Sequence, residues 1–232
     1  MRQFTVRLAR QTALPDGRIV GEFSAPVAPG HAPGQFYLAR AGAAPGSYLR
    51  EALFPEAAGG WAFDLPPAWA ALRPGDEMDL IGPCGRGWPA AEGGRVLLIA
   101  GALGARRVLP LARAAVEQGA AAVLLCERPQ PLGDLPAEVE VRFGLAGLPE
   151  ALHWATSVYA DLPDESLAEL RRWLSDGARP GGWPGGPQVR AFRLPVTPCG
   201  VGACGACAVP AGRGWKLACL DGPWFEMSEL AG

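Results

Sequence analysis

The chain has 232 residues, of which 49% are hydrophobic and 19% are charged, a composition typical of a globular protein. Its formal net charge of −2 gives no reason to expect a nucleic-acid or membrane-surface partner. The longest uncharged apolar run, Val96–Ala105, is about half the length that a membrane-spanning helix needs. The first residues lack the apolar core of a signal peptide, so a cytoplasmic location is expected.

Residues 1–92 predict a small antiparallel β-barrel or sandwich. Short apolar segments alternate there with turn signals rich in Gly and Pro, such as Leu14–Gly17 and Arg73–Asp76. Many short strands at this spacing are typical of such folds, and no long helix is expected. The predicted strands are Gln3–Ala9, Arg18–Phe23, Gln35–Ala39, Gly60–Leu65 and Glu77–Ile81.

Residues 93–178 predict a Rossmann-like parallel sheet. Arg95–Ala100 is almost entirely apolar, as in a strand buried on both faces. Gly101–Gly104 turns the chain into a helix predicted over Ala105–Gln118, where Pro110 is tolerable only near the first turn. Strands that alternate with helices favour a parallel sheet. The other predicted elements are the strands Ala121–Cys126, Val139–Phe143 and Ser157–Ala160 and the helix Asp164–Asp176.

Residues 179–232 predict a linker followed by a small C-terminal domain. The linker, residues 177–187, consists largely of Gly and Pro. The remainder is too short to build a hydrophobic core of its own. We therefore expect it to be stabilised by a bound metal centre and by docking to the rest of the chain.

Four of the six cysteines lie in this C-terminal part, with the spacing C-x4-C-x2-C-x11-C. The first three match the plant-type spacing for a [2Fe–2S] cluster, in which a fourth cysteine comes from elsewhere in the chain. Glycines between them allow the backbone N–H groups to approach the cluster sulfides closely. The predicted ligands are Cys199, Cys204, Cys207 and Cys219.

Zinc sites, disulfides and Rieske centres also use cysteine side chains. A zinc ion also accepts four thiolates, but structural zinc sites usually present two short cysteine pairs, and Cys219 has no cysteine two to four residues away. Disulfides are typical of secreted proteins, which this chain does not resemble. The set contains no histidine, which disfavours a Rieske centre. Of the other two cysteines, Cys126 is expected in the core, and Cys84 either lines a flavin site or fills a turn.

A barrel, a Rossmann-like unit and a C-terminal cluster loop occur in the same order in one family. The chain resembles the electron-transfer subunit of NAD-linked dihydroorotate dehydrogenase, within the ferredoxin-reductase-like group. The resemblance is most specific at Cys199–Cys204 followed by Cys219–Phe225. Leu80–Trp88 is similar to the glycine-rich segment that closes the flavin domain, and Val96–Gly104 to the strand and turn that open the nicotinamide domain.

The resemblance implies a [2Fe–2S] cluster, FAD and NAD as cofactors, and a hetero-oligomer with an FMN-containing catalytic subunit. It implies a relay in which NADH reduces FAD, the cluster accepts single electrons, and the partner's FMN receives them. The process would be pyrimidine biosynthesis. The implied flavin contacts are Arg50, Gly82, Pro83 and Gly85, and the implied nicotinamide contacts are Gly101 and Gly104.

Both nucleotide regions depart from the family pattern. Arg50 is present, but the Ser or Thr that follows in the family is replaced by an apolar residue. Ala102 replaces a Gly, which puts a methyl group where the backbone must approach a pyrophosphate. The pair Arg106-Arg107 at the helix start would meet an anion or simply solvent. Ala160–Pro163 replaces the Cys-Gly-Pro that faces the nicotinamide.

Three functions follow from this sequence. The first is an electron-transfer subunit that carries FAD and a [2Fe–2S] cluster and serves a dihydroorotate dehydrogenase-type catalytic chain. The second is a non-catalytic docking or redox-sensing subunit whose reductase domains are scaffold. The third is a reductase subunit of a hydrogenase- or transhydrogenase-like complex. They differ in the cofactors bound and in the partner.

Overall fold

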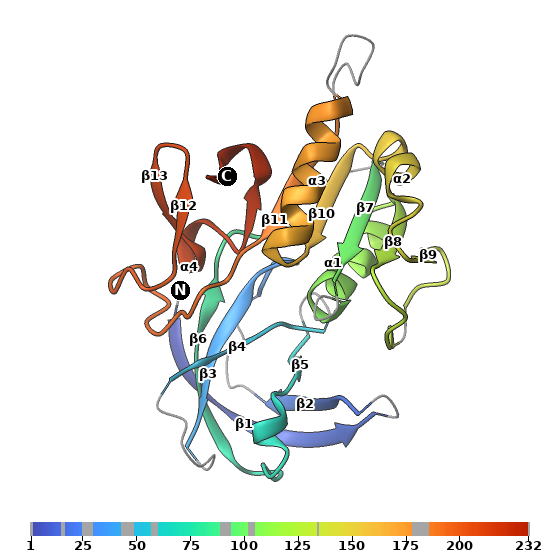
Figure 1. Ribbon diagram of the computed structural model, residues 1–232. Coiled ribbons are helices and arrows are strands. Elements are labelled where there is room, and N and C mark those ends of the chain that lie inside the picture. The colour runs from blue at the N-terminus through green and yellow to red at the C-terminus, as the bar shows by residue number, and fades with distance from the viewer. Residues whose placement is uncertain are drawn as a thin grey trace. The chain divides into compact units, whose positions relative to one another are not determined.

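The computed structural model describes residues 2–14, 17–24, 30–42, 49–56, 60–88, 94–101, 105–133, 135–177 and 186–231 (Figure 1). The chain forms two compact units, and the segment after residue 193 is divided between them. Unit 1 contains Met1–Trp88, Leu194–Val209 and Trp215–Pro223, and unit 2 contains Pro89–Arg193, Pro210–Gly214 and Trp224–Gly232.

Unit 1 is built on a six-stranded antiparallel sheet in the order β4-β3-β6-β1-β2-β5. Just after β4, Pro55 forms a bridge with Phe63 of β5, so the two ends of the sheet meet and nearly close a barrel. This confirms the predicted antiparallel barrel. The strands are β1 (Arg2–Ala13), β2 (Ile19–Ser24), β3 (Phe36–Ala41), β4 (Glu51–Leu53), β5 (Ala62–Asp64) and β6 (Glu77–Cys84).

The core of unit 1 is rich in aromatic side chains. Tyr37, Phe63 and Trp69 are almost completely buried there, and the Tyr37 and Phe63 rings meet edge to face. Trp69 comes from the short 3-10 helix η1 (Pro67–Trp69). Strand β4 was not predicted, because three residues beginning with Glu51 carry too little periodicity to identify a strand.

Unit 2 is built on a six-stranded mixed sheet in the order β14-β11-β10-β7-β8-β9. All neighbours are parallel except β11 and β14, so the predicted Rossmann-like sheet is confirmed. From β7 the chain runs outward to β8 and β9 and then returns past β7 to β10. The topological switch point therefore lies between β7 and β10. The strands are β7 (Arg95–Ala100), β8 (Ala121–Cys126), β9 (Glu140–Phe143), β10 (Ser157–Asp161), β11 (Gln188–Phe192) and β14 (Trp224–Glu226).

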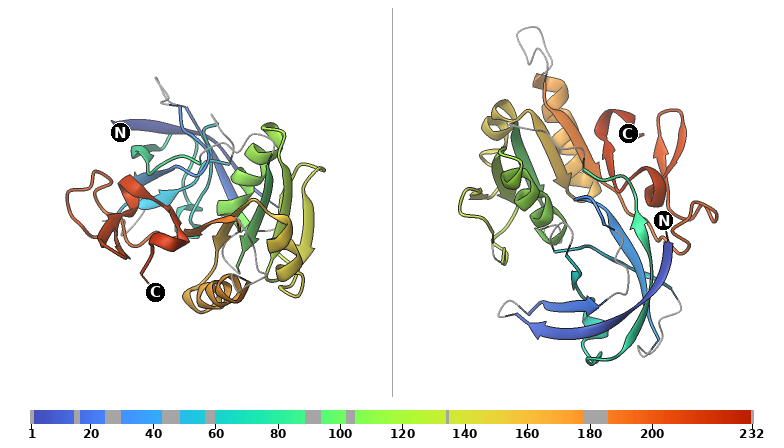
Figure 2. Two further views of the ribbon diagram at one scale, coloured as in Figure 1. Left: turned by 90° about the horizontal axis from the view of Figure 1, so that it is seen from above. Right: turned by 180° about the vertical axis from the view of Figure 1, so that it is seen from behind.

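Helices cover both faces of this sheet. Helices α2 (Leu148–Trp154) and α3 (Asp164–Gly177) pack on the face that carries Leu97 and Ile99. Helix α1 (Ala105–Glu117) covers the opposite face (Figure 2). Pro110 lies in the second turn of α1, whereas a position near the first turn was expected from the sequence. The buried face of α1 holds the helix on the sheet despite the proline.

Two strands of unit 2 come from the C-terminal part of the chain. β11 and β14 fall in the predicted third domain but belong to the sheet of unit 2. Their pairing joins residues more than 30 positions apart, which local sequence patterns do not reveal. The domain limits at residues 92 and 178 stay a prediction. The remaining elements are β12 (Ala208–Ala211), β13 (Gly214–Leu217), α4 (Ala218–Asp221) and η2 (Met227–Glu229).

Over the part of the chain that the structure describes, we find no helix both long enough and apolar enough to cross a membrane.

Leu97→Ala tests the packing of unit 2. Leu97 is completely buried between the sheet and its helices, so truncation leaves a cavity. We expect a loss of about 2–5 kcal/mol in the free energy of unfolding. Phe143→Ala, at an edge-strand side chain that is 54% exposed, is the control and should cost much less. Urea unfolding of both variants measures the difference, and equal losses would contradict this packing.

Candidate iron–sulfur site

All four predicted cluster ligands belong to unit 1. Cys199, Cys204 and Cys207 lie in the segment between β11 and β12, and Cys219 lies in α4. Cys207 and Cys219 are buried, with their Sγ atoms 3.4 Å apart, whereas Cys204 is exposed. The N–H of Ala218 donates to the carbonyl of Cys207 at 3.0 Å, which holds the two cysteine segments together.

The backbone of the cysteine loop is folded to receive an anion. Backbone N–H groups of Val201, Ala203 and Cys204 and the Cys204 side chain all bond to the Cys199 sulfur. Burial raises the pKa of Cys199, but these bonds outweigh it and lower the pKa to about 6. Cys199 is therefore the thiol best prepared to bind as a thiolate.

Gly200 is required for this loop to rest on the barrel. Its φ of +68° is one that other residues rarely adopt. A Cβ atom at this position would lie 2.8 Å from Leu38 Cδ1 and 3.2 Å from Ile81 Cγ2. The loop is thus seated directly on strands β3 and β6.

In the described part of the chain, no three His, Cys, Asp or Glu side chains are gathered to hold a single metal ion. The cysteines show a different arrangement, with one close thiol pair and one thiol surrounded by N–H donors. Four cysteines of this kind fit the all-thiolate donor set of a [2Fe–2S] cluster.

The turn that follows β6 contacts the Cys219 segment. The N–H of Gly85 donates to the Cys219 carbonyl at 2.8 Å, and the N–H of Arg86 donates to the Gly222 carbonyl at 2.7 Å. The Arg86 guanidinium lies 3.3 Å from Asp221. Asp221 in turn accepts a bond of 3.0 Å from the N–H of Leu217. The turn therefore fixes both ends of α4.

Three of the four residues implied as flavin contacts, Gly82, Pro83 and Gly85, lie in this turn or at the end of β6. A Cβ atom at Gly82 would collide with the Tyr37 ring. Gly85, with φ +78°, has a carbonyl that accepts a 2.8 Å bond from Gln35 Nε2. The segment thus lies between the barrel and the cysteines, and its contact with a flavin stays a prediction.

Cys84 lies beneath the cysteine loop. Its side chain is completely buried, and its Sγ is 3.6 Å from the Ile81 carbonyl and 3.9 Å from the Gly200 carbonyl. Burial, with a smaller effect from Cys219, raises the pKa of the Cys84 thiol to about 12. Cys84 therefore packs against the loop as a neutral thiol.

Arg50, the fourth residue implied as a flavin contact, is anchored to the barrel. Its Nη1 donates to the Asp79 carbonyl at 3.1 Å. Burial and the nearby Arg40 lower the pKa of Arg50, while Asp79 opposes them. Tyr48, its neighbour in the segment compared with the family, lies outside the described residues.

At the switch point of unit 2, only part of the predicted nicotinamide turn is described. The N–H of Gly101 donates to the Asp161 carbonyl at 2.8 Å, and a Cβ atom at Gly101 would lie 3.1 Å from that oxygen. Gly101 therefore packs closely between β7 and β10. Gly104 and Ala102 lie outside the described residues.

An ion pair spans the same switch point. Arg107 Nε lies 3.3 Å from a carboxylate oxygen of Asp161, and the Arg107 guanidinium carbon lies 4.4 Å from the centroid of the Phe192 ring. Burial raises the pKa of Asp161, although Arg107 and Arg193 lower it. A dinucleotide bound here would meet a buried carboxylate and an arginine that is already paired. In the described part of the switch point, the positive charge of Arg107 is therefore already matched within the chain.

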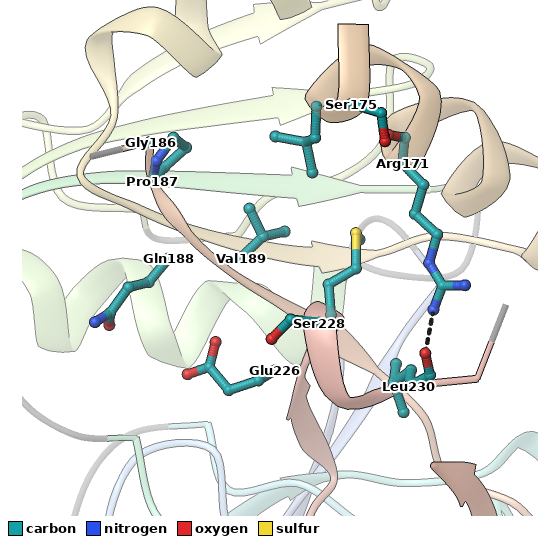
Figure 3. A pocket seen from close by; sticks show the side chains of 11 residues that line it. Arg171, Ser175, Gly186, Pro187, Gln188, Val189, Glu226, Ser228 and Leu230 are labelled. Carbon is teal, nitrogen blue, oxygen red and sulfur yellow. Dashed lines mark hydrogen bonds between the residues drawn. The ribbon is translucent and has the colours of Figure 1, made fainter. Parts of the chain in front are cut away.

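Unit 2 also contains a cavity of about 710 Å³, bordered by α3, β11 and the segment after β14 (Figure 3). Its charged side chains are already engaged within the unit. Arg171 donates to the carbonyls of Leu230 and Ala231, and Glu226 pairs with Arg190. None of the predicted site residues lines this cavity.

Comparisons with known proteins agree with the cysteine site. Residues 197–231 match the family model of the iron-sulfur cluster binding domain of dihydroorotate dehydrogenase B. The chain is 28% identical over 181 residues to the electron transfer subunit of dihydroorotate dehydrogenase B (NAD(+)) from Bacillus caldolyticus, covering 69% of this chain and 68% of that protein. The corresponding subunit from Shouchella clausii (strain KSM-K16) is 29% identical over 192 residues, with the same coverage.

Solved structures share the fold at low sequence identity. An NADH-dependent reduced ferredoxin-NADP oxidoreductase superposes with a TM-score of 0.74 at 19% identity, covering 97% of this chain and 89% of that one. Phthalate dioxygenase reductase gives a TM-score of 0.57 at 13% identity, with 94% of each chain covered. Taken with the family model and the two subunits, these matches confirm the resemblance: the chain is similar to the electron transfer subunits of dihydroorotate dehydrogenase B and has a ferredoxin-reductase-like fold.

Proposed function

We propose that this chain is an electron-transfer subunit that holds a [2Fe–2S] cluster with Cys199, Cys204, Cys207 and Cys219. The observation that carries the proposal is the arrangement of these cysteines, with one close thiol pair and one thiol bonded by the loop backbone. The cluster would supply one-electron chemistry, in exchange with FAD and with a partner dehydrogenase.

The thiol pair indicates how the ligands would be shared. Two thiolates on one tetrahedral metal ion, with bonds of about 2.3 Å, lie about 3.8 Å apart. The Sγ atoms of Cys207 and Cys219, 3.4 Å apart, are near that separation. We therefore assign them to one iron, and Cys199 and Cys204 to the other.

For FAD, the proposed contacts are Arg50, Gly82, Pro83 and Gly85. Arg50 supplies a positive charge on the barrel, as a pyrophosphate requires. Gly85 donates directly to the Cys219 carbonyl. This bond supports a short connection between a flavin at the turn and the cluster, within unit 1.

For the partner, we propose an FMN-containing subunit of the dihydroorotate dehydrogenase type in the cytoplasm, acting in pyrimidine biosynthesis as a hetero-oligomer. The named relatives support this choice over a hydrogenase- or transhydrogenase-like complex. Four apolar side chains of unit 1 near the cysteines in sequence are strongly exposed, as expected of a docking surface: Val196 (66%), Val201 (54%), Trp215 (70%) and Leu220 (44%).

One observation favours a second candidate, a cluster-bearing docking or redox-sensing subunit that does not oxidise NADH itself. The ion pair between Arg107 and Asp161 lies where a parallel sheet usually binds its nucleotide. Nicotinamide contacts at Gly101 and Gly104 remain the alternative, and the two candidates differ in the response to NADH.

Cys219→Ser tests the cluster. Wild-type protein purified without oxygen should contain about two iron and two acid-labile sulfide per chain, with the EPR signal of a reduced [2Fe–2S] centre. The variant removes one ligand of the close thiol pair and should lose most of both. Cys126→Ser, a substitution at a buried cysteine of unit 2, is the matched control and should keep them. Wild-type protein that is colourless, or that contains zinc without sulfide, would contradict the proposal.

NADH separates the two candidates. We expect flavin bands above the broad cluster absorption, and we expect dithionite to bleach both. NADH should leave the spectrum unchanged, because Arg107 at the switch point is already paired with Asp161. The measurement is an anaerobic titration. Rapid bleaching by NADH would show that the chain oxidises NADH itself and would support the first candidate. Protein without flavin would leave only the docking or sensing subunit.

Trp215→Ala tests the docking surface. Large aromatic side chains often dominate an interface, so we expect the dissociation constant for the FMN-containing subunit to rise at least about tenfold. Trp173→Ala, at a side chain of α3 that is 45% exposed, is the control and should have little effect. Isothermal titration calorimetry compares the two. Equal affinities for both variants would place the interface elsewhere.

A further inference from the structure

Cys84 and the cysteine loop approach each other at one peptide group. The Cys84 thiol lies 3.9 Å from the Gly200 carbonyl, across 116 positions of sequence. The carbonyl of Gly200 and the N–H of Val201 belong to the same peptide unit. That N–H is one of the donors to the Cys199 sulfur. A continuous path of polar groups therefore leads from the buried thiol of Cys84 to a proposed cluster ligand.

Polarisation along this path runs from the Cys84 thiol to the Val201 N–H. A thiol that donates to the Gly200 carbonyl draws electron density toward the oxygen and makes the Val201 N–H a stronger donor. Cys84 serves as a donor because its completely buried sulfur lies beside two carbonyl oxygens, which accept hydrogen bonds and cannot donate them. The Ile81 carbonyl, 3.6 Å from the same sulfur, competes for the proton.

The packing holds this geometry in place. Gly200 is wedged against Leu38 and Ile81, and a Cβ atom there would also lie 3.4 Å from the Cys84 sulfur. The side chain of Cys84 is completely buried at the end of β6. The thiol and the peptide therefore cannot move apart without disturbing the packing of Gly200 on Leu38 and Ile81.

We propose that Cys84 is a positioning residue for the cluster: its thiol polarises the Gly200–Val201 peptide, strengthens the hydrogen bond to Cys199 and raises the reduction potential. This inference rests on the proposed cluster. Hydrogen bonds to cluster sulfurs stabilise the reduced form, which carries one more negative charge, and so set the potential. The role is distinct from that of a ligand, since Cys84 would never touch iron.

The experiment compares four variants of the full-length protein, purified without oxygen, by redox titration followed by EPR. Cys84→Ala and Cys84→Val remove the donor. We expect about a threefold fall in the equilibrium constant for one-electron reduction, or about 28 mV at 59 mV per tenfold. Cys84→Ser keeps a donor, and its potential should not fall. Cys126→Ala, in unit 2, is the matched control and should leave the potential unchanged.

The four variants still test the proposed role of Cys84 if one of them binds iron poorly. Iron loss from Cys84→Val with retention in Cys84→Ser would also support a hydrogen-bonding role. Equal iron loss from both, or potentials of Ala, Val and Ser variants that all match the wild type, would assign Cys84 to packing alone and overturn the inference. These outcomes differ from a wild-type protein without iron and sulfide, which would contradict the proposed function itself.

Discussion

Two backbone hydrogen bonds underlie the candidate site. The N–H groups of Gly85 and Arg86 donate to the carbonyls of Cys219 and Gly222, and these bonds attach the fourth cysteine to the end of a barrel strand. The segment around Cys219 is too short to form a core of its own, so its position must come from the rest of unit 1. These two bonds hold Cys219 in place. Only then can the spaced cysteines, the packing of Gly200 on the barrel and the contact with Cys84 form one site.

The two nucleotide regions differ in their electrostatics. In unit 1, Arg50 is anchored through one N–H to the Asp79 carbonyl, and that carbonyl does not cancel its charge. In unit 2, Arg107 is neutralised by the buried Asp161 and stacked on Phe192. A positive charge already matched within the chain contributes little to binding a pyrophosphate. The barrel therefore keeps a positive charge for a flavin pyrophosphate, whereas the positive charge of Arg107 in the parallel sheet is already matched.

Much of this arrangement was predictable from the sequence, and the exceptions have physical reasons. The buried strands Arg95–Ala100 and Ala121–Cys126 were predicted to the residue, because a continuous apolar run leaves little choice. The cysteine spacing predicted the ligand set because three thiolates on one small loop follow a narrow pattern, and this set stays a prediction. Strands β11 and β14 were missed because their pairing partners lie far away in sequence. The ion pair of Arg107 with Asp161 was also missed. The sequence indicated that an arginine at the helix start would meet an anion or solvent, but it did not indicate which residue supplies the anion.

The long sequence separation between the barrel and its cysteines has a consequence for biogenesis. The turn at Gly85 is synthesised more than 100 residues before Cys219, with which it bonds, and Cys84 is synthesised 116 residues before Gly200. The chain also alternates between the two units after residue 193, so neither unit is complete until that last part has left the ribosome. Cys219 can therefore bond to the turn at Gly85 only after the strands from β1 to β11 have all been synthesised.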